Sequence, residues 1–209
     1  IKRYTANADT TITNAYKENL RTRATGSNMG LADSLEVFHI YGQESSTSAE
    51  NSRILIDFPV TTTITSDRSA GTIPASGSVS WFLRVHNVAH PSTLPRNYNM
   101  TISAVSRSWD EGTGLDMEGY SDSGSCNWTA AASSSGGVTA WTTAGGDYHA
   151  STTGSTAYFD DGTEDIEIDI SHLVEEWVKG QSGGAKGDIY GVGIKMENES
   201  ALSSSYTKK

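Results

Sequence analysis

Two acidic clusters hold the residues of this sequence best suited to bind a cation. Each cluster places carboxylates around glycine; the members are Asp110, Glu111, Asp116 and Glu118 in the first, and Asp160, Asp161, Glu164 and Asp165 in the second. Glycine between oxygen donors lets the backbone wrap a Ca²⁺ ion and offer carbonyl oxygens. Neither cluster has EF-hand spacing, so an ordinary acidic turn is the interpretation we prefer for each. The candidate ligands of a structural Ca²⁺ ion are Asp110, Glu111, Asp116, Asp160 and Asp161; no other cofactor is indicated.

A catalytic site is not indicated. The single cysteine, Cys126, has no nucleophile signature around it, and a buried, inert thiol is the simpler interpretation. The five histidines are scattered and do not have the spacing of a zinc motif. A glycosidase would need one carboxylate from each acidic cluster to face a sugar, and nothing in the sequence pairs them. We therefore expect a protein that is not an enzyme.

Aromatic residues in a Gly- and Ser-rich region form a second candidate site. Trp128, Trp141 and Tyr148 lie between residues 110 and 163, where aliphatic residues are scarce. Aromatic rings on loops can stack on sugar rings while neighbouring polar groups bind the hydroxyls. The other interpretation, which we prefer, is that these rings attach long loops to the core.

The elements that must position these residues are mostly strands. Ile166, Ile168 and Ile170 alternate with acidic residues, which predicts a half-buried strand. The apolar period then changes to that of a helix over residues 171–179, with Trp177 as its largest buried contact. Asp169 or Ser171 could cap its start, and Gly180 suits a left-handed C-terminal position. A helix this short needs tertiary contacts, so we expect it to close one end of a sandwich.

Further strands follow from alternating apolar residues. They are predicted at residues 4–16, 35–41, 53–58, 79–85, 98–104 and 190–196, with a last strand beginning near 203–207. Residues 43–52 are polar and predict a mobile loop. Residues 61–78 are rich in Thr, Ser and Gly, and residues 73–77 within them predict a turn. Residues 110–163 predict a loop-rich insertion with two short strands, near Trp128 and Tyr158.

Length and composition favour one fold class. With 209 residues and strands joined by Gly- and Ser-rich turns, we expect one domain over residues 1–209: a jelly-roll-like antiparallel β-sandwich with a short C-terminal capping helix. One cysteine excludes an internal disulfide.

The net charge bears on partners and location. A formal charge of −10 disfavours nucleic-acid partners, and no apolar run is long enough to insert into a membrane. The charge suits an extracellular protein. Because Ile1-Lys2-Arg3 precedes no apolar segment, we expect either a removed leader or another route of export. We also expect that the chain is truncated near Lys209.

Several segments, in order, resemble the DNRLRE family of β-sandwich modules. They are Ala8–Ile12, Asn28–Gly30, Ser52–Phe58, Val105–Gly112, and Ile168–Gly180 followed by Tyr190–Lys195. The resemblance implies a jelly-roll-like sandwich that serves as an accessory module of larger secreted or surface proteins. Some members of the family are carbohydrate-binding modules, so the resemblance also implies this function as an alternative.

A narrower resemblance concerns phage particles. Residues 2–16, 26–30 and 111–118 are similar to segments of virion structural proteins of marine tailed phages. This implies a non-catalytic structural or display module, located on the virion outside the cell, whose partners are other virion proteins or copies of itself. The alternative is a carbohydrate-binding module of a secreted or surface protein, with surface glycans as ligands.

Overall fold

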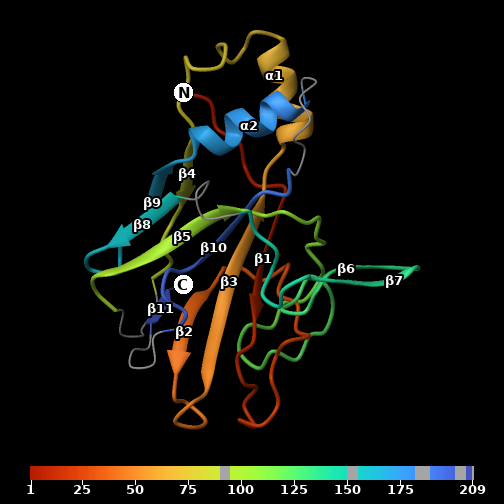
Figure 1. Cartoon of the computed structure of the whole chain (residues 1–209), viewed down its shortest axis with the longest axis vertical. Coiled ribbons are helices and arrows are strands. Elements are labelled where there is room, and N and C mark those ends of the chain that lie inside the picture. Colours follow the sequence, from red (N-terminus) through yellow and green to blue (C-terminus); the bar gives the residue numbers. More distant parts are fainter. Residues whose placement is uncertain (90–94, 150–154, 182–188, 201–205, 209) are drawn as a thin grey trace.

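One large antiparallel sheet organises the chain in the computed structural model (Figure 1). The structure describes residues 1–89, 95–149, 155–181, 189–200 and 206–208. Within them the sheet has seven strands: β1 (Ala8–Thr13), β2 (Val37–Tyr41), β3 (Ala49–Asp57), β5 (Tyr98–Ala104), β8 (Ser155–Phe159), β10 (Val192–Met196) and β11 (Tyr206–Lys208). Their order is β11-β2-β3-β10-β5-β8, and β1 pairs with β3.

Two smaller strand pairs and short helices complete the described chain. β4 (Phe82–Val85) pairs with β9 (Ile166–Asp169), and β6 (Ala130–Ser134) pairs with β7 (Gly137–Ala140). The helical segments are η1 (Val60–Ile64), α1 (Thr65–Ser69) and α2 (Ser171–Gln181). Figure 1 shows α1 and α2 at one end of the large sheet and the β6–β7 hairpin projecting from its side. The all-β, antiparallel fold class is confirmed, and the jelly-roll strand order stays a prediction.

Strand β3 separates two hydrophobic cores, because successive residues of a strand face opposite sides of the sheet. Ile54 and Ile56 belong to the larger core, which also contains residues of β4, β9 and α2. Leu55 belongs to the second core, together with Ile12 of β1 and the rings of the Gly-rich region. Loops therefore cover one face of the large sheet, and the small β4–β9 sheet covers part of the other.

Helix α2 closes one end of the larger core, as the sequence predicts. Trp177 is 5% exposed and packs within that core. The Asp169 carboxylate accepts the Ser171 N–H at 2.7 Å, and the Ser171 hydroxyl accepts the Trp81 N–H at 2.7 Å, so the helix start is joined to the segment before β4. The prediction that Gly180 ends the helix in a left-handed conformation is wrong, because the helix continues through Gly180 to Gln181.

Two polar stretches are more ordered than the sequence indicates. Residues 43–52 were expected to form a mobile loop, but β3 already begins at Ala49, and Glu50 is 2% exposed. Pairing with β2 satisfies the backbone of this polar stretch. In the Thr-, Ser- and Gly-rich residues 61–78, the predicted turn is present, since the Ser78 N–H donates to the Ala75 carbonyl at 3.1 Å, but η1 and α1 occupy the first part of the stretch. Val60 and Ile64, four residues apart, both reach the larger core from η1.

The insertion expected over residues 110–163 is shorter than predicted. The strand expected near Tyr158 is β8, which pairs with β5 in the large sheet. Strands β6 and β7 follow Trp128. The first strand is also shorter than expected and covers Ala8–Thr13. The last strand, β11, is described at Tyr206–Lys208; residues 203–205 of that prediction lie outside the described residues.

Candidate functional site

The three candidate aromatic residues come together, but inside the protein. Trp128 and Trp141 are 7% and 5% exposed in the second core, and Tyr148 packs against them. The Trp141 indole N–H donates to the Asn127 carbonyl at 2.8 Å. A ring must offer an open face to stack on a sugar. The expectation that these rings form an exposed stacking platform is therefore wrong, and the alternative that they attach loops to the core is what the structure shows.

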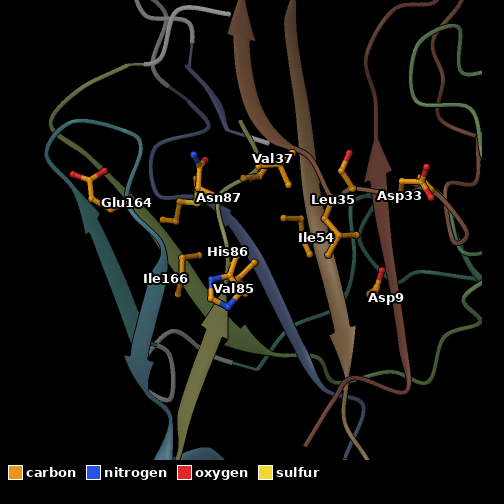
Figure 2. Close-up of a pocket in the computed structure, with 14 residues that line it drawn as sticks. Asp9, Asp33, Leu35, Val37, Ile54, Val85, His86, Asn87, Glu164 and Ile166 are labelled. Carbon is orange, nitrogen blue, oxygen red and sulfur yellow. The ribbon is translucent and has the colours of Figure 1, made fainter. Parts of the chain in front are cut away.

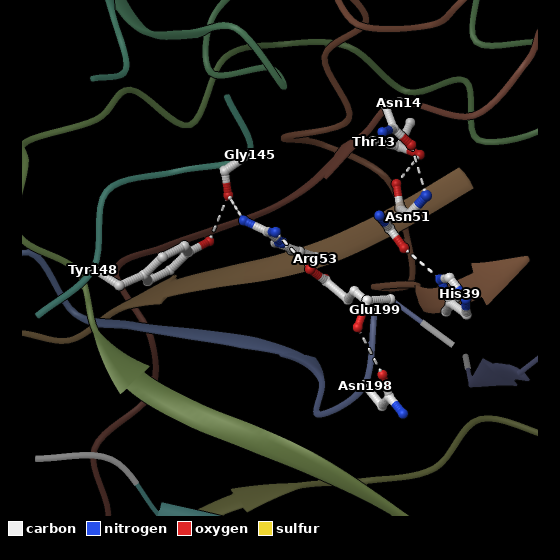
Figure 3. A network of polar contacts seen from close by, with 10 residues as sticks. Thr13, Asn14, His39, Asn51, Arg53, Gly145, Tyr148, Asn198 and Glu199 are labelled. Carbon is white, nitrogen blue, oxygen red and sulfur yellow. Dashed lines mark hydrogen bonds and ion pairs between the residues drawn. The ribbon is translucent and has the colours of Figure 1, made fainter. Parts of the chain in front are cut away.

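An ion pair joins this aromatic cluster to the end of the chain (Figure 3). Arg53 of β3 binds Glu199 through two parallel contacts of 2.9 and 2.5 Å, with both side chains nearly buried. The guanidinium carbon lies 4.9 Å from the Trp128 ring centroid and 5.8 Å from that of Tyr148. Arg53 and the Tyr148 hydroxyl both donate to the Gly145 carbonyl, and burial raises the pKa of Tyr148. These groups hold the Gly-rich segment against the sheet.

Polar contacts continue along β3 in the same view. His39 Nδ1 lies 2.7 Å from Asn51 Oδ1, and the Asn51 N–H donates to Asn14 Oδ1 at 2.6 Å. His39 is fully buried. The contacts join β2, β3 and the end of β1, so they are structural rather than part of an accessible site (Figure 3).

The first acidic cluster stabilises loops. The Asp110 carboxylate accepts the Ser133 N–H at 2.8 Å, and the Glu111 carboxylate accepts the Asp9 N–H at 3.0 Å. Asp116 accepts the Ser121 hydroxyl and three backbone N–H groups within its own loop. These hydrogen bonds, the Ser121 hydroxyl first, hold the pKa of Asp116 well below its usual range.

The second acidic cluster is also a turn. Glu164 Oε1 accepts the N–H groups of Asp160 and Asp161 at 2.8 and 2.7 Å, and the Asp161 carboxylate lies 3.5 Å from the Arg96 guanidinium. Over the described ranges, no three His, Cys, Asp or Glu side chains are grouped to hold a metal ion. The expected Ca²⁺ ligands are therefore not grouped into a site. The carboxylates of Asp110, Glu111 and Asp116 accept hydrogen bonds from loops and strands instead.

Asn28 is the structural residue that the sequence patterns missed. Its side-chain NH₂ donates to the carbonyls of Glu111 and Cys126, both at 2.8 Å, and its Oδ1 accepts the Gly114 N–H at 2.7 Å. It is 1% exposed. A Cβ on Gly114 would lie 2.0 Å from the Asn28 carbonyl oxygen, so only glycine fits there. The segments containing Asn28 and Gly114 were each noted in the sequence, but their spacing alone does not join them.

A small cavity opens between the large sheet and the β4–β9 sheet (Figure 2). Its volume is about 240 Å³; apolar side chains including Val37, Ile54 and Ile166 form its floor. Asp9 and Asp33 lie on one side of the opening, with Glu164 on the other. Burial, and secondarily the Glu111 carboxylate, raise the pKa of Asp9. The cavity has room for a small molecule only.

A larger groove lies beside α2. Its volume is about 1070 Å³, and it is bounded by residues 1–5, η1, β4 and α2. Tyr4, Trp81 and Phe82 contribute aromatic walls, and Phe82 is 56% exposed. At its rim Lys2 pairs with Asp67, and Arg84 pairs with Glu167. The groove therefore offers aromatic surface next to charged groups.

The outer part of one hairpin lies outside the cores. The β6–β7 hairpin is anchored at its base by Ala130, Ala131 and Trp141, all nearly buried, whereas residues 133–140 are all exposed. Figure 1 shows the hairpin extending away from the large sheet. In the part of the chain that the structure describes, no helix combines the length and apolar character needed to cross a bilayer.

The likeness of the sequence motifs to DNRLRE modules and to phage virion proteins stays a prediction. Comparison with known proteins identified no matching family model, no matching curated protein and no matching solved structure.

Proposed function

We propose that this chain is a non-catalytic structural or display module of a virus particle, located outside the cell and assembled with other particle proteins or with copies of itself. Its partners meet it through protein surface rather than through a substrate site. The phage-like segments at residues 2–16, 26–30 and 111–118 motivate the particle as its location.

The observation that carries the proposal is that the candidate ligand-binding side chains are buried or hydrogen-bonded, whereas the outer part of one hairpin is exposed. The residues best suited to bind a ligand are engaged in packing: Trp128 and Trp141 are buried, and Asp116 accepts hydrogen bonds from its own loop. By contrast, residues 133–140 are exposed and contribute nothing to either core. An element that projects without packing is suited to contact another chain.

Mass spectrometry of density-purified marine virus particles tests this function. The tryptic peptide covering residues 54–68 marks the chain, and the matching cell-secreted fraction is the comparison. We expect the peptide to be enriched with particles, at a constant ratio to a known capsid peptide across the density gradient. Recovery in the secreted fraction alone, with no enrichment in particles, would overturn the proposal.

A carbohydrate-binding module is the second candidate, and the groove beside α2 is the observation that favours it. Tyr4, Trp81 and Phe82 lie in its walls, and Phe82 is largely exposed. Apolar ring faces next to charged and polar groups are typical of sugar sites. The groove is a better location than the original candidates Trp128, Trp141 and Tyr148, whose rings are covered.

Affinity electrophoresis against marine polysaccharides tests the second candidate. A retarded mobility that is lost in Phe82→Ala but kept in Tyr158→Ala, a matched change at an exposed aromatic residue outside the groove, would support sugar binding there. Unchanged mobility with every polysaccharide would argue against it. Loss on Trp128→Ala alone would indicate a structural effect, because that ring is core.

A further inference from the structure

Strand β7 has an open edge that its partner strand β6 lacks. On the outer side of β6, the Asp110 N–H donates to the Ala131 carbonyl at 3.0 Å, and the Asp110 carboxylate accepts the Ser133 N–H at 2.8 Å. Among the described residues, β7 pairs with β6 alone. The far edge of β7 therefore presents backbone N–H and C=O groups that are free to pair with another strand.

Apart from its short length, the edge of β7 lacks the features that usually limit strand addition. Lysine, proline and bulges protect many exposed edges. Gly137–Ala140 contains no charge and no proline, and the register irregularity of the hairpin falls between Ala130 and Ala132. Val138 is 70% exposed at its centre. No charged side chain and no proline of this strand therefore opposes a partner strand.

Charge indicates which partner this edge suits. The chain has a net charge of −10, so two copies repel each other through most surfaces. Between Asp122 and Asp147, however, the sequence contains no Asp, Glu, Lys, Arg or His, and this neutral stretch includes the whole hairpin. The hairpin projects from the body (Figure 1), so two hairpins can meet while the acidic bodies stay apart.

Symmetry and stability favour the same partner. Two identical strands that pair antiparallel about a two-fold axis match every donor of one edge with an acceptor of the other. A two-stranded hairpin is marginally stable alone, whereas a sheet of three or more strands is much better supported. Pairing would also cover Val138 of each copy.

We propose that β7 is a self-association edge, through which two copies of this chain pair antiparallel into a continuous four-stranded sheet in the order β6-β7-β7-β6. The inference deepens the proposed assembly function, on which it rests, by naming a second copy as a partner. The paired strands are short, so the contact is weak, with a Kd of about 10–1000 µM. In a particle, many copies at high local concentration would populate it.

Sedimentation equilibrium on the purified full chain tests the proposal. We expect a monomer–dimer equilibrium that Val138→Lys weakens by about tenfold or more, because it places like charges opposite each other across the edge. Ser133→Lys is the matched control: it adds the same charge to the same hairpin, on β6 opposite Val138, and should leave Kd within about twofold. Circular dichroism and melting temperature confirm that both variants are folded.

Amide hydrogen exchange locates the contact. Peptides covering β7 should exchange more slowly as protein concentration rises, while those covering α2 should not change. A chain that stays monomeric at millimolar concentration overturns the inference, as does a dimer that Val138→Lys leaves intact or that gives β7 no added protection. Failure of this inference would not change the expected result of mass spectrometry on virus particles. Conversely, absence of the chain from particles would overturn the proposed function even if the purified chain dimerises.

Discussion

Oδ1 of Asn28 accepts the backbone N–H of Gly114 at 2.7 Å, although the two residues lie 86 positions apart. The same amide group donates to the carbonyls of Glu111 and Cys126. One buried side chain therefore fixes both ends of the loop that carries the first acidic cluster. These hydrogen bonds give a loop rich in Gly and Ser a defined shape.

Asn28→Ala should lower the free energy of unfolding by about 2–4 kcal/mol, since it leaves two buried carbonyls without donors. Gly114→Ala should cost about 3 kcal/mol, because its Cβ would lie 2.0 Å from a backbone oxygen. Gly26→Ala is the control: no atom lies within 4 Å of its Cβ, and the change should stay under about 0.5 kcal/mol. Urea denaturation measures all three. Equal effects at Gly114 and Gly26 would contradict the assigned role of Asn28.

Trp177→Ala should destabilise the protein by about 3–5 kcal/mol, because it removes a large ring from the larger core and leaves a cavity. The exposed neighbour Glu176→Ala should change stability by less than about 0.5 kcal/mol. Thermal and chemical denaturation provide the comparison. A similarly small effect for Trp177→Ala would mean that α2 does not close the core.

Glu175 should make stability depend on acid pH. Its pKa is lowered from 4.5 to about 2, chiefly by the Arg68 guanidinium and also by the Trp81 indole N–H. A group with a lowered folded-state pKa stabilises the fold above its unfolded pKa, and that contribution is lost as pH falls through the folded value. The stability difference between wild type and Glu175→Gln should therefore shrink between pH 4.5 and about 2. Urea midpoints across this range measure it; a constant difference would contradict the assignment.

The Cys126 thiol should be unreactive in the folded protein. It is fully buried in the second core, and burial, with a smaller effect of Asp110, raises its pKa, so the reactive thiolate is scarce. Alkylation with iodoacetamide, followed by intact-mass measurement, should show no adduct in buffer and one adduct in urea. Rapid labelling of the native protein would mean that the second core opens easily.

Calcium should not stabilise this protein. The oxygens of Asp116 already accept hydrogen bonds from their own loop, and Asp160 and Asp161 lie in a separate turn. A ligand that binds the folded state raises the melting temperature, so adding CaCl₂ or a chelator should leave it unchanged. Differential scanning fluorimetry is sufficient for this comparison. A rise in melting temperature with calcium would show that one of the acidic loops rearranges around the ion.

Alternating aliphatic residues made much of the fold predictable. Ile166 and Ile168 indicate β9, and Met100 and Ile102 indicate β5, because burial on one face of a strand leaves a period of two. Trp177 in a helical period indicates the buried contact of α2. In these segments, local pattern and tertiary packing agree.

Other parts were not predictable because long-range contacts decide them. Glu50 is buried in a strand although most of residues 43–52 are polar, since β2 pairs with that strand. Trp128 lies among Gly and Ser, a composition typical of exposed loops, yet Arg53 and the second core cover it. Glycines such as Gly112 and Gly114 can indicate a place where another segment approaches the backbone closely. The segment that does so contains Asn28, which only the three-dimensional structure identifies.

The position of β10 has a consequence for synthesis on the ribosome. β10 lies between β3 and β5 and pairs with both, although it is made long after them. Until Met196 has left the exit tunnel, the growing chain carries two strands with edges that have no permanent neighbour. Slow translation would extend this interval, so chaperone supply should limit the soluble yield of this protein.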